Sequence, residues 1–272
     1  MNASASLTIP WALAHEFRPI AAELLRGYFS AQLKDGFTGA HFERLGGGGD
    51  RPEVAHEFTA EDLVAVTMLS VKVPADAALR ILGPDRSRLS ELLREIPTDR
   101  DLVDVGPSEI DHDWAPWLLD DALSDLTGLG RTTVSKLIAR KRPRLIPIYD
   151  REVNKVLALN KGPLWRPLAA ALQADAHAVH LNLLALRDEA GIGGDISPLR
   201  VLDVIVWRTP TGQDELRPVV QSKSAVGVGR EPGVHHHEFV FDRGARRWSY
   251  EQPRTSLGGS DLEEVVHLGA EA

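Results

Sequence analysis

Residues 123–138 read LSDLTGLGRTTVSKLI, and this stretch decides the fold that we predict. Apolar residues at helical spacing stand on both sides of a tight turn, Gly128-Leu129-Gly130, which predicts a helix-hairpin-helix element. The two glycines permit positive φ angles and leave the N–H groups of the turn open to a phosphate at the start of the next helix. Leu129 would anchor the turn in the core. The same glycines also suit a plain connection between two core helices that binds no ligand.

Six basic side chains follow the turn, and no acidic residue lies among them between residues 131 and 149. They are Arg131, Lys136, Arg140, Lys141, Arg142 and Arg144. Because the whole chain has a formal net charge of −8, this run would be one basic patch on an acidic body. An acidic body repels nucleic acid at long range, whereas a local patch holds backbone phosphates. We therefore expect a local contact with the backbone of duplex DNA.

The composition of the 272 residues, 43% apolar and 26% charged, is that of an ordinary folded protein. The absence of cysteine excludes disulfides, a thiolate metal site, an iron–sulfur cluster and a cysteine nucleophile. No signal peptide and no uncharged apolar run of about 20 residues is found, so we expect a cytoplasmic protein with no membrane partner. The histidines and their acidic neighbours lack metal-ligand spacing. We predict no metal and no cofactor.

Apolar residues recur at helical spacing over most of residues 1–208, which predicts an all-α body. We expect one or two helices within 11–35, and others at 62–71, 75–82, 85–95, 114–126, 132–140, 151–159, 164–172, 176–189 and 198–207, with Thr59 and Asp62 forming a capping box. Residues 36–54 contain four consecutive glycines and are predicted to be a mobile loop. Residues 209–272 are predicted to be a small appendage, either a β-hairpin of strands 238–242 and 247–251 or partly disordered.

The hairpin carries a family resemblance. The stretch from Leu126 to Val134, LTGLGRTTV, resembles the Leu-Pro-Gly-Val-Gly-Arg-x-Thr-Ala hairpin of the helix-hairpin-helix DNA glycosylases typified by endonuclease III. Members with lyase activity hold a lysine where this chain has Thr132, and their catalytic aspartate follows 18 residues later. Eighteen residues after Thr132 stands Asp150, in the sequence IYDREV. The resemblance implies that Asp150 is the catalytic carboxylate.

Another resemblance lies upstream, at residues 62–72, which read DLVAVTMLSVK. This stretch is similar to a glycosylase helix that ends in Leu-Leu-Ser-Ala-Gln and whose last residue fills the gap left by a flipped base. Lys72 takes that place here. Within the superfamily, the chain looks most like a group of actinobacterial proteins of unknown function that share the phrases ARKRPRLIP, at 139–147, and LRVLDV, at 199–204.

The resemblance implies a monofunctional DNA glycosylase-like protein that flips a base out of the duplex and cleaves its N-glycosidic bond. Thr132 would contact DNA beside Arg131 but cannot form a Schiff base, so no lyase activity is implied. Asp150 is equally suited to be only the N-cap of a helix that starts at Arg151. The alternatives are therefore a non-catalytic nucleic-acid-binding module on the same fold, or a scaffold whose hairpin packs against a protein partner. The base that would be recognised cannot be read from the sequence.

Overall fold

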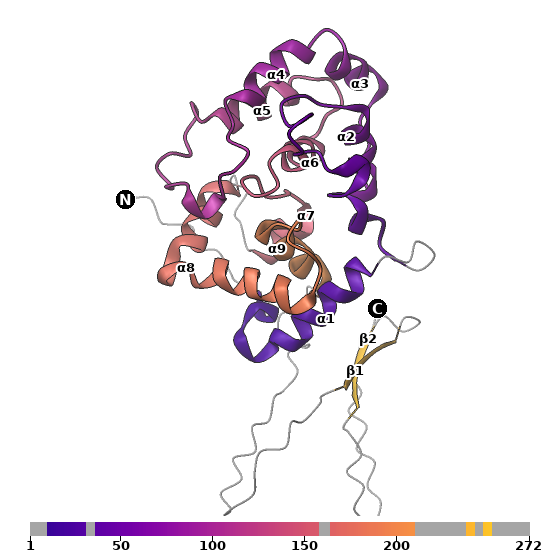
Figure 1. Cartoon of the computed structure of the whole chain (residues 1–272), viewed down its shortest axis with the longest axis vertical. Helices are drawn as coiled ribbons and strands as arrows, with labels where there is room; N and C mark the ends of the chain where they lie inside the picture. Colours follow the sequence, from indigo (N-terminus) through magenta and orange to yellow (C-terminus); the bar gives the residue numbers. More distant parts are fainter. Residues whose placement is uncertain (1–9, 31–35, 158–163, 210–237, 243–246, 252–272) are drawn as a thin grey trace, which may run out of the picture. The chain divides into compact units, whose positions relative to one another are not determined.

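The computed structural model describes residues 10–30, 36–157, 164–209, 238–242 and 247–251, and the chain divides into two units, Met1–Thr209 and Pro210–Ala272 (Figure 1). In the second unit, strands β1 (Glu238–Asp242) and β2 (Arg247–Glu251) pair antiparallel, with Glu238 opposite Glu251. These are the two strands that the alternating sequence pattern predicts. No helix in the described part of the chain is long and apolar enough to cross a membrane.

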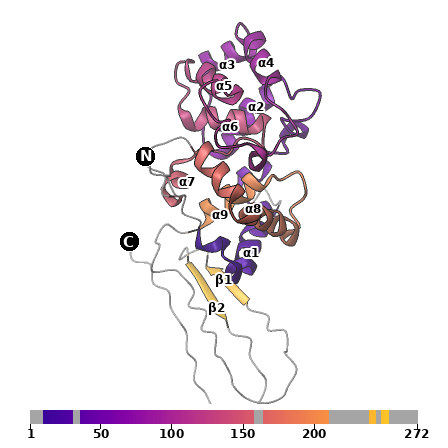
Figure 2. The same ribbon diagram turned by 90° about the vertical axis from the view of Figure 1, so that its left-hand side faces the viewer.

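The first unit is all-α, as predicted, and its helices form two neighbouring groups (Figures 1 and 2). One group holds α2 (Ala60–Ala65), α3 (Ala75–Leu82), α4 (Arg86–Arg94), α5 (Ala115–Ser124) and α6 (Arg131–Lys141), with the 3₁₀ turns η3 (Thr38–His41), η4 (Leu45–Gly47) and η5 (Val66–Leu69). The other group holds η1 (Trp11–Leu13), η2 (His15–Phe17), α1 (Arg18–Phe29), α7 (Arg151–Val156), α8 (Trp165–Ala190) and α9 (Pro198–Arg208), and the 3₁₀ turn η6 (Leu102–Asp104) packs against α8.

Two predicted helices differ from the structure in an informative way. The helix expected at 62–71 ends as an α-helix at Ala65, tightens into the 3₁₀ turn η5, and stops at Ser70, whose φ of 61° is left-handed. A non-glycine residue there costs about 1–2 kcal/mol, so the packing around Ser70 must impose it. The helices expected at 164–172 and 176–189 are two segments of α8, separated by non-helical backbone from Ala174 to His177.

The core follows from the apolar stripes of the predicted helices. Leu119 and Leu123 of α5 and Leu137 and Ile138 of α6 are completely buried, so the two hairpin helices pack directly on each other. Each fully buried leucine or isoleucine side chain contributes about 1.5–3 kcal/mol. The hairpin helices therefore sit on a rigid base.

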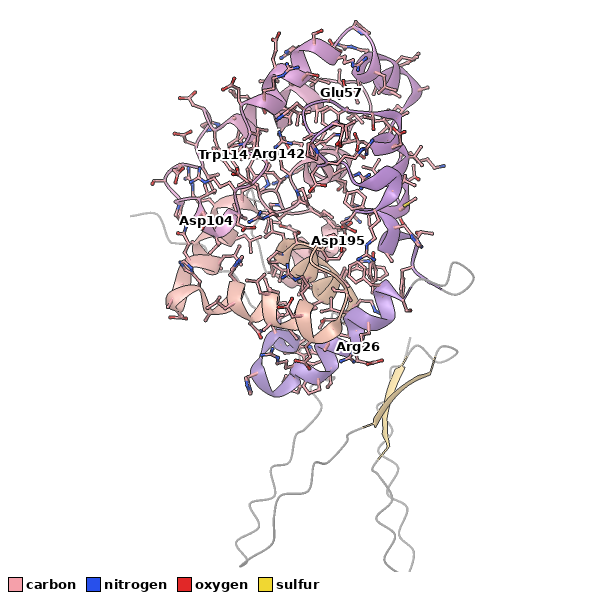
Figure 3. All side chains as sticks on the ribbon, viewed as in Figure 1. Arg26, Glu57, Asp104, Trp114, Arg142 and Asp195 are labelled. Atoms are coloured by element: carbon pink, nitrogen blue, oxygen red, sulfur yellow. The ribbon has the colours of Figure 1, made fainter. Side chains whose placement is uncertain are left out.

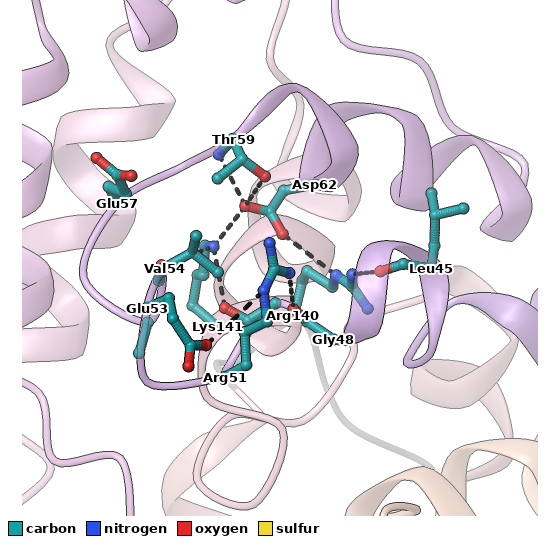
Figure 4. A network of polar contacts seen from close by, with 12 residues as sticks. Leu45, Gly48, Arg51, Glu53, Val54, Glu57, Thr59, Asp62, Arg140 and Lys141 are labelled. Atoms are coloured by element: carbon teal, nitrogen blue, oxygen red, sulfur yellow. Dashed lines mark hydrogen bonds and ion pairs between the residues drawn. The ribbon is translucent and has the colours of Figure 1, made fainter.

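The glycine-rich stretch 36–54 differs from its prediction as a mobile loop. It wraps around the end of α6, whose cations bind its carbonyl oxygens (Figure 4). Arg140 donates to the carbonyls of Phe42, Glu43 and Leu45. Lys141 donates to the carbonyl of Gly49 at 3.0 Å and that of Val54 at 3.1 Å. The prediction was wrong because it considered only the backbone entropy that glycines lose on folding. The hydrogen bonds from Arg140 and Lys141 offset that loss.

Candidate functional site

The turn between α5 and α6 has the geometry that its glycines predict. Gly128 has a φ of 84°, and Gly130 is the N-cap of α6 with a φ of −82°. Both glycines are exposed, whereas Leu126 before the turn and Leu129 between the glycines are 2% and 7% exposed. The first N–H groups of a helix have no partner within that helix. The first N–H groups of α6 therefore lie at an exposed turn. Leu126 and Leu129 anchor this turn in the core.

Three of the other predicted DNA contacts lie at or near this turn. Arg131 and Thr132 are the first two residues of α6, and the guanidinium of Arg131 lies 4.0 Å from the centre of the Tyr149 ring. Lys72 is exposed, two residues before Pro74. Pro74 packs so closely on the turn that a Cβ at Gly128 would lie 2.9 Å from its Cγ. The segment that holds Lys72 therefore runs beside the hairpin.

The predicted basic patch is wrong for four of its six members. Four of the basic side chains after the turn are buried, with 4% or less of their surface exposed: Lys136, Arg140, Lys141 and Arg142. A buried cation needs protein oxygens in place of water, and each of these four has them. Their charges are held inside the protein and do not form a surface for phosphate.

Asp62 is the counter-ion of two of these cations (Figure 4). Its Oδ1 lies 3.2 Å from Arg140 Nε, and its Oδ2 lies 2.5 Å from Lys141 Nζ. Oδ2 also accepts the backbone N–H of Thr59 at 2.8 Å, which is the contact that the predicted capping box requires. Burial lowers the pKa of Lys141, and Asp62 opposes that shift. One carboxylate thus joins α2, the end of α6 and the glycine-rich loop.

Arg142 and Arg144 also have partners within the protein. Arg142 lies among the interior side chains (Figure 3) and donates to the carbonyls of Ile96 and Ala55, while burial lowers its pKa to about 10. Arg144 is half-exposed but forms a two-bond ion pair with Asp101. Of the six cations, Arg131 is the one that lies at the hairpin turn, as the first residue of α6.

Asp150 lines a cavity of about 230 Å³ between the two helix groups. The wall includes residues of α1, η3, η5, α6 and α9, so chain segments from residue 28 to residue 207 meet there. Leu69 and Ser70, which precede Lys72 by three and two residues, are also part of it. The two regions that the sequence singled out, 62–72 and 150, therefore share one cavity.

Lys136 fixes the position of Asp150 in the cavity. Its Nζ lies 3.4 Å from Asp150 Oδ2 and donates to the carbonyl oxygen of Leu69 at 2.8 Å. The backbone carbonyl of Asp150 accepts the N–H of Asn154 at 2.9 Å, so Asp150 also stands at the N-cap position of α7. The structure therefore gives Asp150 both features that the sequence left open, a helix-start position and a carboxylate on a cavity.

Aromatic rings form another part of the wall. Tyr28 and Phe37 are stacked, with ring centres 5.0 Å apart and an angle of 13° between the planes. The Trp207 ring meets Phe37 edge-on at 5.6 Å, and Trp207 remains 48% exposed. Arg200 lies over the Tyr28 ring at 5.3 Å, and Arg208 lies over the Phe37 ring at 4.7 Å. Trp207 is therefore the ring of the three with the most surface left for a planar ligand. The cavity is smaller than the roughly 300–1,000 Å³ of pockets for drug-sized molecules, so it suits a single small ring system.

A family model matches residues 21–210, which include the hairpin and every residue of the cavity wall. The chain belongs to DUF6308. This family is described as one of unknown function. No curated protein and no solved structure matches the chain. The β-hairpin of β1 and β2 lies outside the DUF6308 region.

The DUF6308 region also contains a charged cluster that the sequence analysis missed. Arg200 donates to the hydroxyl oxygen of Tyr28 at 2.9 Å, forms an ion pair with Asp203, and its Nε lies 2.7 Å from Glu43 Oε1. Burial raises the pKa of Glu43 and of Asp203, and Arg200 opposes both shifts. The available signal was the placement of Arg200 and Asp203 three residues apart in the apolar run 198–206.

The cluster and the cavity define what the DUF6308 site offers chemically. Asp150 and Asp203 supply carboxylates to one small cavity, the aromatic rings supply a stacking surface, and Lys136 supplies a buried ammonium. Among the described residues, no group of three or more histidine, cysteine or acidic side chains could hold a metal ion. The site is thus suited to a planar ring and to chemistry that needs a carboxylate.

Proposed function

We propose that this protein is a DNA-binding, monofunctional glycosylase-like hydrolase that draws a flipped base into the cavity and cleaves its N-glycosidic bond. The observation that supports this most is the shared cavity of Asp150 and the Leu69-Ser70 segment. The resemblance to the helix-hairpin-helix glycosylases singled out both regions for connected roles, a carboxylate and a gap-filling residue. Their common cavity is lined by aromatic rings, as the binding of a base requires.

Asp150 would act on the sugar. Breaking the bond between C1′ and the base builds positive charge on the sugar ring, and a fixed carboxylate stabilises that charge. Asp150 could also orient the attacking water and accept its proton. Lys136 keeps the carboxylate in place through its ion pair at 3.4 Å. The side chain of Asp150 is 29% exposed, so substrate and water can reach it.

Lyase chemistry is not part of the proposal. Lys136 lies on the cavity, but its Nζ donates to the Leu69 carbonyl and faces the Asp150 carboxylate. Both contacts hold Nζ against protein oxygens, so Lys136 is not placed to attack C1′ as a nucleophile. Thr132 occupies the position of the lyase lysine in the resembling family. We therefore expect hydrolysis that leaves an intact abasic site.

DNA would be held at the hairpin turn. The exposed N–H groups at the start of α6 provide a phosphate site, and Arg131 and Lys72 lie close to it. Because four of the other cations are buried, the contact involves few phosphates. Local binding of this kind fits a chain with a net charge of −8.

Single-turnover base release tests the proposal. Duplexes that each carry one deaminated, oxidised or alkylated base are incubated with excess protein, and the free base and the abasic strand are measured. We expect release from at least one duplex, without strand cleavage. Salt-sensitive binding to duplexes without any release would instead favour the non-catalytic module, in which Asp150 only begins α7. Absence of both binding and release would contradict both functions.

A further inference from the structure

The cations on the cavity wall are occupied by protein oxygens. Lys136 Nζ donates to Leu69 O and faces Asp150. Arg200 donates through Nη2 to Gly39 O at 2.8 Å and to the Tyr28 hydroxyl at 2.9 Å. Its Nη1 bonds to Asp203 Oδ2, and its Nε lies beside Glu43. Neither cation is oriented to serve as the main donor to a ligand in the cavity.

Acceptors, by contrast, remain available there. Asp203 Oδ2 accepts from Arg200, but no donor to Asp203 Oδ1 is found among the described residues, and the side chain is 11% exposed on the cavity wall. Thr38, also on the wall, gives its hydroxyl proton to the carbonyl of Met68 at 2.9 Å. Its oxygen can then only accept from a ligand. The hydroxyls of Tyr28 and Ser70 can donate or accept a hydrogen bond, so they do not distinguish an amino group from an oxo group.

We infer that the cavity selects a base with an exocyclic amino group, such as an adenine or cytosine edge, and that Asp203 accepts the hydrogen bond from that group. The inference rests on the proposed function in taking a base as the ligand. An amino group supplies two donors to a wall with two available acceptors. An oxo group at the same position would place an oxygen against a carboxylate, with no cation left to bind it.

The expected selectivity is large because the acceptor is a carboxylate. A hydrogen bond to a charged group contributes more than one between neutral groups, and without an amino base Asp203 Oδ1 has no donor among the described residues, although Oδ2 keeps its bond from Arg200. An amino base should therefore bind at least about tenfold more tightly than its oxo counterpart. Because Asp203 touches the ligand but not the sugar, its effect should fall on the choice of base.

Binding of free bases to the full-length protein tests the inference by calorimetry, with quenching of Trp207 fluorescence as a second signal. Adenine is compared with hypoxanthine, and cytosine with uracil, because each pair differs in an amino-to-oxo exchange. Purine and N6,N6-dimethyladenine, which lack the N–H donors of the exocyclic amino group, should bind more weakly than adenine. Equal or tighter binding of the oxo bases, or no binding of any base, would overturn the inference.

The variant Asp203→Asn adds a direct test, because asparagine can turn its amide to accept or to donate. We expect it to reduce the preference for adenine over hypoxanthine to less than about threefold. If Asp203→Asn does not fold, the series of free bases with the wild-type protein still decides the matter. Selective binding without base release from DNA would support the inference and contradict the proposed hydrolysis. Release of oxo bases alone would support the proposed hydrolysis and contradict the selection of amino bases.

Discussion

Lys136 Nζ lies 3.4 Å from Asp150 Oδ2 and 2.8 Å from the carbonyl oxygen of Leu69, at a position where Lys136 is only 4% exposed. A buried ammonium requires such partners, so the contact is part of the fold as well as of the site. It connects the second hairpin helix to the proposed catalytic carboxylate and to the turn that precedes Lys72. A substitution that keeps the contact of residue 150 with Lys136 but removes its negative charge can therefore test the role of that charge alone.

Asp150→Asn is predicted to fold and to lose base release. Asparagine caps helices about as well as aspartate, and its carbonyl oxygen can still accept from Lys136, so we expect a stability loss of at most about 1–2 kcal/mol. Without the negative charge near C1′, release should fall by at least about a hundredfold. Single-turnover release and a thermal melt measure the two effects. Undiminished release by the folded variant would leave Asp150 as a cap only.

The two glycines of the hairpin should respond differently to alanine. A Cβ at Gly130 meets no atom within 4 Å, and its φ of −82° suits any residue, so Gly130→Ala should cost less than about 1 kcal/mol of stability. The added methyl group lies at the proposed phosphate site and should reduce duplex affinity about tenfold. Fluorescence anisotropy with a labelled duplex measures this. Unchanged affinity would mean that the turn only connects two helices.

Gly128→Ala is the contrasting variant. Its φ of 84° is unfavourable for alanine, and the new Cβ would lie 2.9 Å from Pro74 Cγ. We expect a loss of about 1–2 kcal/mol of stability from the backbone alone. Urea denaturation of both variants should show the larger shift for Gly128→Ala. Equal shifts would contradict the geometry of the turn.

Salt dependence reports how many cations touch phosphate. With four of the six cations buried, we expect the logarithm of the binding constant to fall with the logarithm of the salt concentration with a slope of about −2, from Arg131 and Lys72. Arg131→Gln should reduce that slope by about one. Arg26→Gln, an exposed site on α1, is the matched control and should leave it unchanged. A slope near −5 would show that the buried cations become exposed on binding.

Asp62 should be among the most sensitive positions for stability. Asp62→Ala leaves Arg140 and Lys141 buried without their counter-ion, which typically costs about 3–5 kcal/mol. Asp188→Ala is the matched control, because its ion pair with Arg187 is at the surface and should contribute less than about 1 kcal/mol. Urea denaturation compares the free energies of unfolding. Similar losses for both would show that the Asp62 network does not stabilise the fold.

The preference for amino bases should depend on pH. Burial raises the pKa of Asp203, while Arg200 and Lys136 lower it and Asp150 raises it. The charged and titratable groups around it on the packed elements are Arg200, Glu43, Lys136, Asp150 and the hydroxyl of Tyr28. Above the raised pKa, Asp203 is ionised and accepts from an amino group. Below it, the carboxyl gains a proton, becomes a donor and tolerates an oxo group.

Adenine and hypoxanthine titrations from neutral toward acidic pH measure this change. The preference for adenine should be present above the raised pKa of Asp203 and should decline as the pH falls through it, at a pH above the ordinary range of an aspartic acid. Asp203→Asn, which has no proton to gain, is the control and should show no such decline. A preference that is independent of pH in the wild-type protein would place the selectivity in another residue.

The sequence alone determined the local parts of this protein. Periodic apolar residues predicted the helices, and the Gly128-Leu129-Gly130 turn predicted the hairpin, because both depend on residues within a few positions of each other. The resemblance to the glycosylase hairpin, through its spacing of 18 residues, likewise singled out Asp150, whose side chain the structure places on a cavity. These features survive because turn geometry and helix spacing are set mainly by neighbouring residues.

Only the tertiary structure decided where the charges lie. A run of cations reads as a surface patch unless its partners are known, and those of Arg140 and Lys141 are Asp62 and loop carbonyls roughly 80 to 100 residues earlier in the chain. Arg200 likewise meets Tyr28 172 residues away. A charged side chain can be buried only where protein oxygens replace the water that solvated it. Here those oxygens belong to residues far away in the sequence, and only the packing of the chain places them next to the charge.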